Sequence, residues 1–243
     1  MTRSLVVDFD GVVCDAFEEC ALVTWLGLHG VDPDLRISSY LRALPTTFLD
    51  QFAHVRNFAR TLDEFVVAHV LGDERPRTLV RFREIFDELP GEFVRTFLAK
   101  ANHARQRCRR EEPKFWLNLH ALYPGIDELL SRHAGEVYVI TAKDAPSVWA
   151  ILRDHRLEHT VKAVYGEASR KDDVMRQLCR EHDRELEDAT FIDDNLLNVS
   201  RVSTTGARAQ WAFWGYHTPE DVEQARAANV QALTLDALPA LAA

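Results

Sequence analysis

Long apolar runs are missing from this chain of 243 residues. None approaches the roughly 18 consecutive apolar residues of a membrane-spanning helix. The short apolar segment near the start is interrupted by Asp8, so a signal peptide is not expected. The four cysteines show no CxxC spacing, which disfavours a zinc site or a disulfide framework and indicates reduced thiols. We therefore expect a cytoplasmic protein that does not bind membranes.

Positive charge is also scarce. The chain has 29 Lys and Arg against 38 Asp and Glu, a net charge of −9. Partners rich in phosphate need a basic field, so this balance disfavours binding to nucleic acid or to an acidic membrane. A small anionic substrate in a locally positive pocket remains compatible with it. Apolar residues, by contrast, make up 47% of the chain, enough for a sizeable core.

The pattern of apolar residues predicts an α/β fold with a long helical insertion. Leu5–Val7 has the composition of a short buried strand. Residues 16–120 then show only helical patterns, at Ala16–Leu28, Ser39–Asn57 (interrupted by Pro45), Thr61–Leu71, Pro76–Leu89 and Glu92–Arg110. We expect 1–15 and 121–243 to form one domain and 16–120 a second, all-helical one.

Strands and helices alternate after Tyr123-Pro124-Gly125. Such alternation predicts a Rossmann-like parallel sheet with right-handed crossovers, which the N-terminal strand would join. The predicted strands are Val137–Ile140, Ala163–Tyr165, Thr190–Ile192, Arg208–Phe213 and Ala232–Leu235. The predicted helices are Ile126–His133, Pro146–His155, Lys171–His182, Leu196–Ser203 and Pro219–Ala228.

Asp8-Phe9-Asp10-Gly11 directly follows the first predicted strand. Residues at i and i+2 of an extended chain point to the same side. Asp8 and Asp10 should therefore project together while Phe9 enters the core, and Gly11 allows the chain to turn. Two carboxylates so close repel each other unless a cation or a proton lies between them. On its own, the segment is also compatible with an acidic surface turn.

Three further polar groups follow or precede predicted strands. They are Thr141, Lys171 and the pair Asp193-Asp194. Taken singly, each has an ordinary explanation: a helix cap for the threonine or the aspartates, and a solvated helix residue for the lysine. Strand ends of a parallel sheet, however, converge on one crevice, so all of these groups can meet Asp8 and Asp10 there.

This set of motifs resembles the haloacid dehalogenase superfamily of phosphatases and phosphotransferases, and in particular its phosphoglycolate-phosphatase-like members. The match covers residues 5–15 and 124–215. The family's DxDG motif corresponds to Asp8–Gly11, its strand-end Thr or Ser to Thr141, its lysine to Lys171 and its acidic pair to Asp193-Asp194. Val12 replaces a frequent threonine, and Asn198 stands where an acidic residue often follows.

The resemblance implies a Mg²⁺-dependent phosphatase acting on a small phosphorylated metabolite. Asp8 would attack phosphorus and form an aspartyl-phosphate, and Asp10 would act as general acid and base. Metal ligands would be the side chains of Asp8 and Asp194, the backbone carbonyl of Asp10, and Asp193 directly or through water. The phosphate would be bound by Asp8, Phe9, Asp10, Thr141, Ala142 and Lys171.

The helical insertion resembles the mobile cap that many members carry after the first motif. Arg56 is our candidate for a substrate contact, because we expect it between two helical stretches rather than within one. Trp211, Trp214 and Tyr216 are expected to pack at the edge of the sheet. The chain is expected to be a monomer or a homodimer.

Other activities of the same fold remain open. A phosphomutase or phosphotransferase would use the same phosphoaspartate, and a non-catalytic binding or regulatory protein is a further alternative. A phosphonatase-type lyase needs a lysine in the cap, where only Lys100 and Lys114 occur. A true dehalogenase typically lacks the second aspartate, so Asp10 argues against it.

Overall fold

A computed structural model describes residues 3–72 and 75–241. Contacts between residues divide the chain into two compact units. Unit 1 comprises Met1–Asp15, Ala121–His217 and Asp221–Ala243, and unit 2 comprises Ala16–His120 and Thr218–Glu220. No helix in the described part of the chain is long and apolar enough to cross a membrane.

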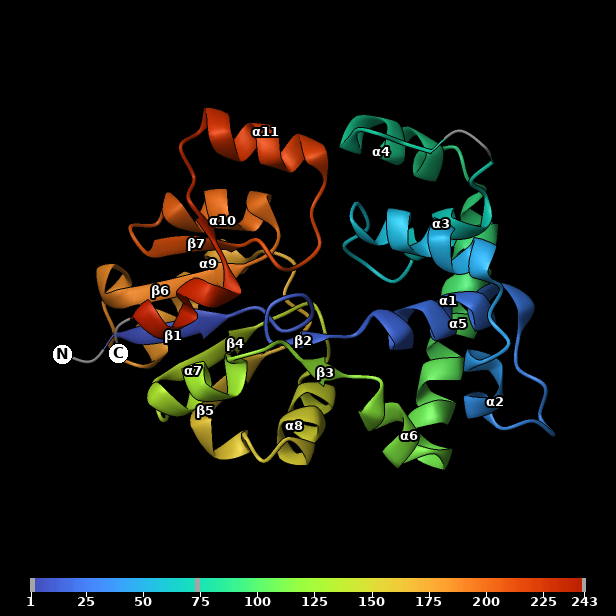
Figure 1. Cartoon of the computed structure of the whole chain (residues 1–243), viewed down its shortest axis with the longest axis horizontal. Coiled ribbons are helices and arrows are strands. Elements are labelled where there is room, and N and C mark those ends of the chain that lie inside the picture. The colour runs from blue at the N-terminus through green and yellow to red at the C-terminus, as the bar shows by residue number, and fades with distance from the viewer. Residues whose placement is uncertain (1–2, 73–74, 242–243) are drawn as a thin grey trace. The chain divides into compact units, whose positions relative to one another are not determined.

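Unit 1 is built on a six-stranded parallel sheet, which confirms the predicted fold class (Figure 1). Its spatial order is β5-β4-β1-β6-β7-β8. Its three central strands, β1, β4 and β6, are buried along their whole length. Continuous apolar runs of Val, Ile and Phe are typical of strands that are covered by helices on both faces. The strands are β1 (Ser4–Val7), β4 (Val137–Ile140), β5 (Val161–Tyr165), β6 (Ala189–Asp193), β7 (Arg208–Ala212) and β8 (Ala232–Leu233).

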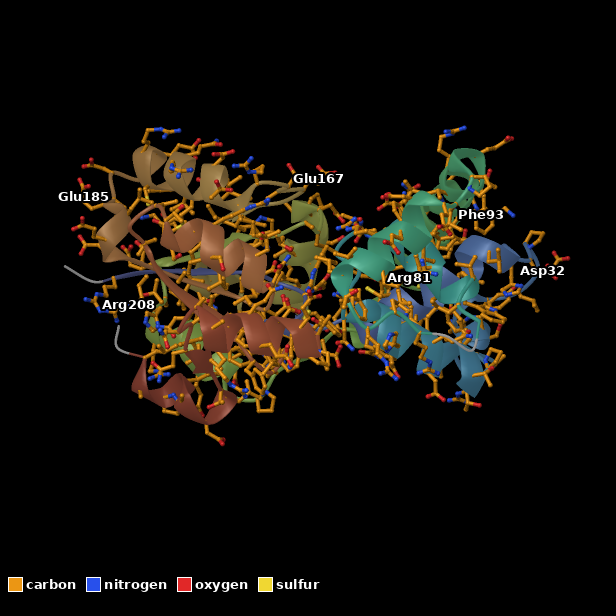
Figure 2. All side chains as sticks on the ribbon, turned by 90° about the horizontal axis from the view of Figure 1, so that it is seen from above. Asp32, Arg81, Phe93, Glu167, Glu185 and Arg208 are labelled. Atoms are coloured by element: carbon orange, nitrogen blue, oxygen red, sulfur yellow. The ribbon has the colours of Figure 1, made fainter. Side chains whose placement is uncertain are left out.

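Helices cover both faces of this sheet. Helices α9 (Lys171–Glu181) and α10 (Leu196–Ser203) lie on one face, and α7 (Ile126–Arg132) and α8 (Ala145–Asp154) lie on the other (Figure 1). The core under α9 and α10 joins side chains of these helices and of the strands, among them Val6, Tyr138, Ile140, Met175, Leu178, Phe191 and Val202. Charged side chains such as Glu167, Glu185 and Arg208 point outward into solvent (Figure 2).

The order of the strands creates a crevice beside β1. Strand β1 pairs with β4 on one side and with β6 on the other. The chain runs outward from β4 to β5 on the first side and from β6 to β7 and β8 on the second. Such a reversal of direction leaves an opening beyond the carboxyl ends of the strands, which is where ligands bind in open α/β sheets.

Two short strands mark the chain's departure from unit 1 and its return. Strands β2 (Cys14–Asp15) and β3 (Ala121–Leu122) pair in antiparallel fashion. Neither has enough residues for a periodic pattern, so neither was predicted.

The regular elements of unit 2, among its described residues, are all helices. Its elements are α1 (Phe17–His29), α2 (Ile37–Leu41), α3 (Thr46–Arg56), the 3₁₀ helix η1 (Glu64–His69), α4 (Leu79–Asp87), α5 (Gly91–Glu111) and α6 (Pro113–Asn118). Its core is rich in aromatic rings, including Phe48, Phe52, Phe58, Phe65, Phe82 and Phe97.

The interruption predicted at Pro45 is confirmed. The stretch Ser39–Asn57 is covered by two helices, α2 and α3, because proline disfavours helical backbone in the residue before it and Pro45 itself is extended. The helix predicted over Thr61–Leu71 was wrong in detail, because the structure has the shorter 3₁₀ helix η1 there. There the Glu64 carboxylate accepts hydrogen bonds from the backbone N–H groups of Arg60 and Thr61, which holds those two residues in a turn outside the helix.

Candidate functional site

The predicted site residues of unit 1 follow three adjacent strands. Asp8 comes after β1, Thr141 comes after β4, and Asp193 ends β6. Lys171 is the first residue of α9, which precedes β6. Because β4, β1 and β6 are neighbours in a parallel sheet, their carboxyl ends lie at the same edge.

Lys171 joins two of the carboxylates. Its Nζ lies 2.8 Å from Asp8 Oδ1 and 2.8 Å from Asp193 Oδ2, and its side chain is only 6% exposed. Burial alone would disfavour the ammonium, but the charges of Asp193 and Asp8 raise the pKa of Lys171 above the usual lysine value. The lysine is therefore a permanent cation at ordinary pH, fixed between two acidic side chains.

Three carboxylates gather around this lysine. Ligand oxygens of Asp8, Asp193 and Asp194 all lie within 4.8 Å of one another. Burial raises the pKa of Asp8 to about 6, although Lys171 opposes the shift, and burial likewise raises the pKa of Asp193. Ionised Asp8 and Asp193 are thus unfavourable here without further positive charge.

The donor set fits a magnesium ion. Carboxylate oxygens are the ligands that this hard cation prefers. Counting Asp10, the site holds four carboxylates against the two ammonium groups of Lys143 and Lys171. The remaining formal charge is two minus, which a single divalent cation balances.

Asp193 and Asp194 have different surroundings. Asp193 is fully buried, and its Oδ1 accepts the Asn195 N–H at 2.7 Å. Its Oδ2 accepts the Asn198 side-chain amide at 3.1 Å in addition to Lys171. Asn198, a departure from the family pattern, therefore orients Asp193. These contacts leave Asp194 better placed than Asp193 to bind an ion directly.

Asp10 is not one of the three carboxylates that gather within 4.8 Å of one another. Its Oδ2 is 2.8 Å from the Nζ of Lys143, and the Cys14 thiol donates to its Oδ1 at 3.8 Å. That Asp8 and Asp10 project together stays a prediction. Strand β1 ends at Val7, and the chain turns at Gly11, whose φ is +90°. Sequence reasoning missed Lys143, although it is one of only five lysines and stands two residues after Thr141.

The remaining predicted phosphate-binding groups lie in the two loops after β1 and β4. The Phe9 N–H donates to Asp8 Oδ1 at 2.7 Å, and its ring is buried in the core as expected. Thr141 is buried, and its hydroxyl accepts the Lys143 N–H at 3.2 Å. Ala142 is exposed between them, in the loop that leads to α8.

Strand β7 and the segment after it contact the two loops that carry the acidic residues, the loop after β1 and the loop after β6. The Tyr216 N–H donates to Asp194 Oδ2 at 2.8 Å, and the Trp214 indole donates to the Val12 carbonyl at 3.2 Å. The Trp211 indole donates to the Asp194 carbonyl at 2.9 Å. We expected these three aromatic residues to pack the sheet edge. Trp211 does pack in a core cluster. In addition, the indoles of Trp211 and Trp214 hold backbone carbonyls of the site, and the Tyr216 N–H holds the Asp194 side chain.

Glycine is required where these loops meet. A Cβ on Gly11 would overlap the Asp194 carboxylate, and a Cβ on Gly215 would overlap the Gly11 carbonyl and the Asp194 side chain. The loops after β1, β6 and β7 therefore approach more closely than any other residue type would allow.

Arg56 does not lie between two helical stretches, and that interpretation was wrong. It is the last residue of α3, with its side chain buried inside unit 2. The guanidinium donates to the Ala59 carbonyl at 3.3 Å and lies 5.4 Å from the centre of the Phe65 ring. The substrate contact that we expected of Arg56 stays a prediction.

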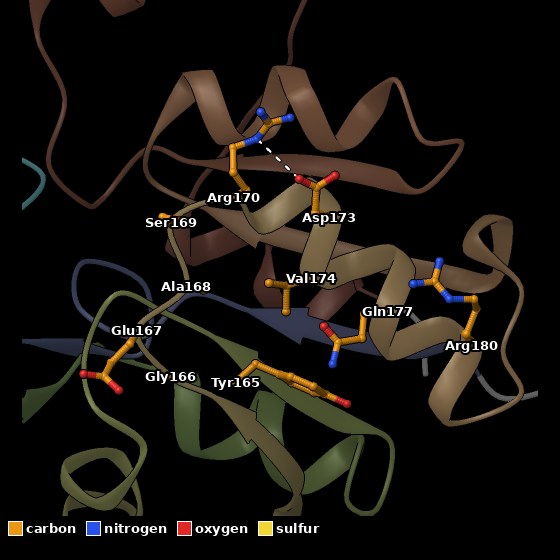
Figure 3. Close-up of a pocket in the computed structure, with 10 residues that line it drawn as sticks. All are labelled: Tyr165, Gly166, Glu167, Ala168, Ser169, Arg170, Asp173, Val174, Gln177 and Arg180. Atoms are coloured by element: carbon orange, nitrogen blue, oxygen red, sulfur yellow. Dashed lines mark ion pairs between the residues drawn. The ribbon is translucent and has the colours of Figure 1, made fainter.

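A cavity of unit 1 lies next to this site but does not contain it. It opens between the loop after β5 and one side of α9, and its volume is about 460 Å³ (Figure 3). Its described lining includes Gly166, Arg170, Asp173 and Arg180 and none of the predicted site residues.

Comparisons with known proteins identify the fold. Neither models of known families nor curated proteins match the sequence. Solved structures do match it. A haloacid dehalogenase-like hydrolase from Streptococcus pneumoniae is 18% identical, with a TM-score of 0.58 over 99% of this chain and 97% of that one. A predicted phosphoglycolate phosphatase from Haemophilus somnus is 17% identical, with a TM-score of 0.60 over 90% and 88%.

A third match gives the same picture. A predicted phosphatase from Clostridium acetobutylicum is 17% identical, with a TM-score of 0.57 over 96% of this chain and 94% of that one. At such identities the likeness concerns the fold, and at that level it confirms the resemblance seen in the motifs. The chain has the fold of the haloacid dehalogenase-like hydrolases.

Proposed function

We propose that this protein is a Mg²⁺-dependent phosphatase that hydrolyses a small phosphorylated metabolite through an aspartyl-phosphate on Asp8. The observation that carries the proposal is the Lys171 ammonium, held 2.8 Å from both Asp8 and Asp193 beside a third carboxylate, Asp194. A buried nucleophile, a fixed cation and an acidic cluster at one sheet edge are what phosphoryl transfer to a carboxylate requires.

The nucleophile must approach a substrate of the same charge. A phosphate monoester carries about two negative charges near neutral pH, judging from phosphorylated amino acids. Lys171 offsets part of the repulsion, and the Thr141 hydroxyl and the loop N–H groups of Phe9 and Ala142 would bind phosphate oxygens. Asp8 would then attack phosphorus, and the leaving oxygen would depart with a proton from Asp10. Asp10 would later take a proton from the water that hydrolyses the aspartyl-phosphate.

The metal would be held by the side chains of Asp8 and Asp194 and by the carbonyl of Asp10. Asp193 would act through water, since its oxygens already accept bonds from Lys171, Asn195 and Asn198. When bound, Mg²⁺ would supply positive charge that offsets the repulsion of the phosphate by the carboxylates.

Unit 2 would serve as the cap that selects the leaving group. Its insertion between Asp15 and Ala121 places it directly after the loop that carries Asp8 and Asp10. Arg56 would contribute to substrate binding from this unit only if its side chain left the Ala59 carbonyl and the Phe65 ring. No disulfide joins the four cysteines, all described and all buried, which favours a cytoplasmic location.

Hydrolysis of a generic aryl phosphate tests the proposal. Wild-type protein should release phosphate with Mg²⁺ and lose this activity with a chelator, and Asp8→Asn should be inactive under all conditions. The exposed Asp236→Asn is a matched control in the same unit and should behave like wild type. A panel of phosphorylated metabolites would then identify the substrate. Turnover that survives in Asp8→Asn would refute the proposal.

A further inference from the structure

Each of the two aspartates with a proposed chemical role has its own lysine. Lys171 contacts the proposed nucleophile Asp8, and Lys143 contacts the proposed acid and base Asp10. The first pair belongs to the predicted motifs, whereas the second does not. We propose that Lys143 is a positioning residue that holds the Asp10 carboxylate in place for proton transfer. This inference rests on the proposed phosphatase function.

The contact is close and largely shielded from solvent. Lys143 Nζ lies 2.8 Å from Asp10 Oδ2, and the two side chains are 8% and 20% exposed. Opposite charges at this distance attract more strongly in a partly desolvated site than in water. Hydrogen bonds between charged partners are also the strongest kind in proteins. The pair therefore restricts the orientation of Asp10 far more than a surface ion pair would.

The backbone of Lys143 is fixed on both sides. Its N–H donates to the Thr141 hydroxyl at 3.2 Å, and its carbonyl accepts the Glu167 N–H at 3.1 Å. The following residue, Asp144, caps α8 by accepting the Ser147 N–H at 2.9 Å. The backbone of Lys143 is thus held in place, and its long side chain reaches Asp10 from there.

Close packing of two loops supports this position. Gly166, in the loop after β5, lies so near that a Cβ there would come 2.8 Å from the Lys143 carbonyl oxygen (Figure 3 labels Gly166 and Glu167). The Ala168 N–H also donates to the Thr141 carbonyl at 2.9 Å. The loop of Lys143 is therefore held against the loop after β5. The two loops are in close contact at Gly166, and the Glu167 and Ala168 N–H groups donate backbone hydrogen bonds between them.

The contact of Asp10 with Cys14, in its own loop, is weaker than its contact with Lys143. The Cys14 thiol donates to Asp10 Oδ1 at 3.8 Å, and a thiol is a poor donor compared with an ammonium. A catalytic group that is displaced by about 1 Å can lose about a hundredfold in rate. We therefore expect the contact between Lys143 and Asp10 to increase the rate of phosphoryl transfer substantially.

The test compares two variants of Lys143 on two kinds of ester. Lys143→Met removes the charge and keeps most of the stem, and Lys143→Arg keeps the charge. Lys162→Met is the matched control. Lys162 is an exposed lysine near the amino-terminal end of β5, whereas the site lies at the carboxyl ends of the strands. The substrates are an aryl phosphate, whose leaving group departs without a proton, and a simple alkyl phosphate, whose leaving group needs one.

We expect Lys143→Met to lower kcat/KM, which reports the phosphoryl-transfer step, by about 10- to 100-fold on the alkyl phosphate. The loss is below the roughly 10²- to 10⁴-fold that a general acid contributes, because Asp10 is still present. The loss of kcat/KM on the aryl phosphate should be clearly smaller. Asp10→Asn should show the same dependence on the leaving group. The double variant should be no slower than Asp10→Asn, Lys143→Arg should restore part of the rate, and Lys162→Met should match wild type.

Three results would overturn the positioning role. The first is an equal loss of kcat/KM on both esters, and the second is losses of Lys143→Met and Asp10→Asn that multiply in the double variant. The third is an unchanged kcat/KM of Lys143→Met on the alkyl phosphate. Failure of the proposed function looks different, because wild-type protein would then lack turnover that depends on Asp8, and the positioning role would fall with it.

Discussion

Asp8→Asn should make the metal-free protein more stable while it removes activity. Asp8 is buried beside Asp193, and burial raises its pKa from the ordinary value of 3.8 to about 6. Ionised Asp8 is therefore less favourable in the folded protein than in the unfolded chain at neutral pH. Asparagine has nearly the same shape and carries no charge, so it relieves this cost.

The magnitude follows from the pKa. A pKa that moves from 3.8 to about 6 corresponds to about 3 kcal/mol, at 1.36 kcal/mol per unit. Below pH 3.8 Asp8 is protonated in both states and the cost is absent. Between pH 3.8 and about 6 the folded protein binds more protons at Asp8, so stability falls as pH rises. Above about pH 6 the full cost applies.

The assay is thermal and urea unfolding of chelator-treated protein across pH 4–8. Asp8→Asn should exceed wild type by up to about 3 kcal/mol above pH 6.5, or about 6–12 °C in Tm for a domain of this size, and by little at pH 4. The exposed Asp236→Asn should change neither value. An Asp8→Asn variant that is less stable than wild type at pH 7.5 would refute the electrostatic reasoning.

Three further predictions concern the same groups. Lys171→Met should lower the free energy of unfolding by about 3–5 kcal/mol, measured in urea, because it leaves Asp8 and Asp193 without their buried cation; an unchanged midpoint would contradict this. Mg²⁺ should raise the Tm of wild type more at pH 7.5 than at pH 4.5, since Asp8, with a pKa of about 6, must be ionised to bind it; equal shifts would argue against this acidic site. Gly215→Ala should weaken Mg²⁺ binding in calorimetry, because its Cβ would displace the Asp194 side chain, whereas Gly72→Ala, whose Cβ would meet no neighbour, should not.

Much of unit 1 could be predicted from the sequence because its core strands are short continuous apolar runs. Val137–Ile140 and Leu196–Ser203 have the predicted bounds. The meeting of Asp8, Lys171 and Asp193 was also predictable, since parallel strands bring their carboxyl ends to one edge. In unit 2 the break at Pro45 could be predicted, but the start of the 3₁₀ helix η1 could not, because local hydrogen bonds to the Glu64 side chain decide it.

The parts of the site that could not be predicted depend on contacts between loops. Lys143 meets Asp10 from the loop after β4, which packs closely against the loop after β5 at Gly166. Tyr216 reaches Asp194 only because Gly11 and Gly215 let three loops approach closely. Periodic patterns of apolar residues do not predict contacts between loops. Two features of the sequence could nevertheless have pointed to them: Lys143, a rare lysine close to Thr141, and Gly215, a glycine between two aromatic residues.

The central claim is that Asp8 carries the phosphoryl group. The most direct measurement is acid-quenched mass spectrometry of the protein mixed with Mg²⁺ and an aryl phosphate, with the modified peptide sequenced. The account predicts one phosphoryl group on the peptide of Asp8, more of it in Asp10→Asn, and none in Asp8→Asn. Turnover with no phosphoryl group on Asp8, or with one on another residue, would contradict the account.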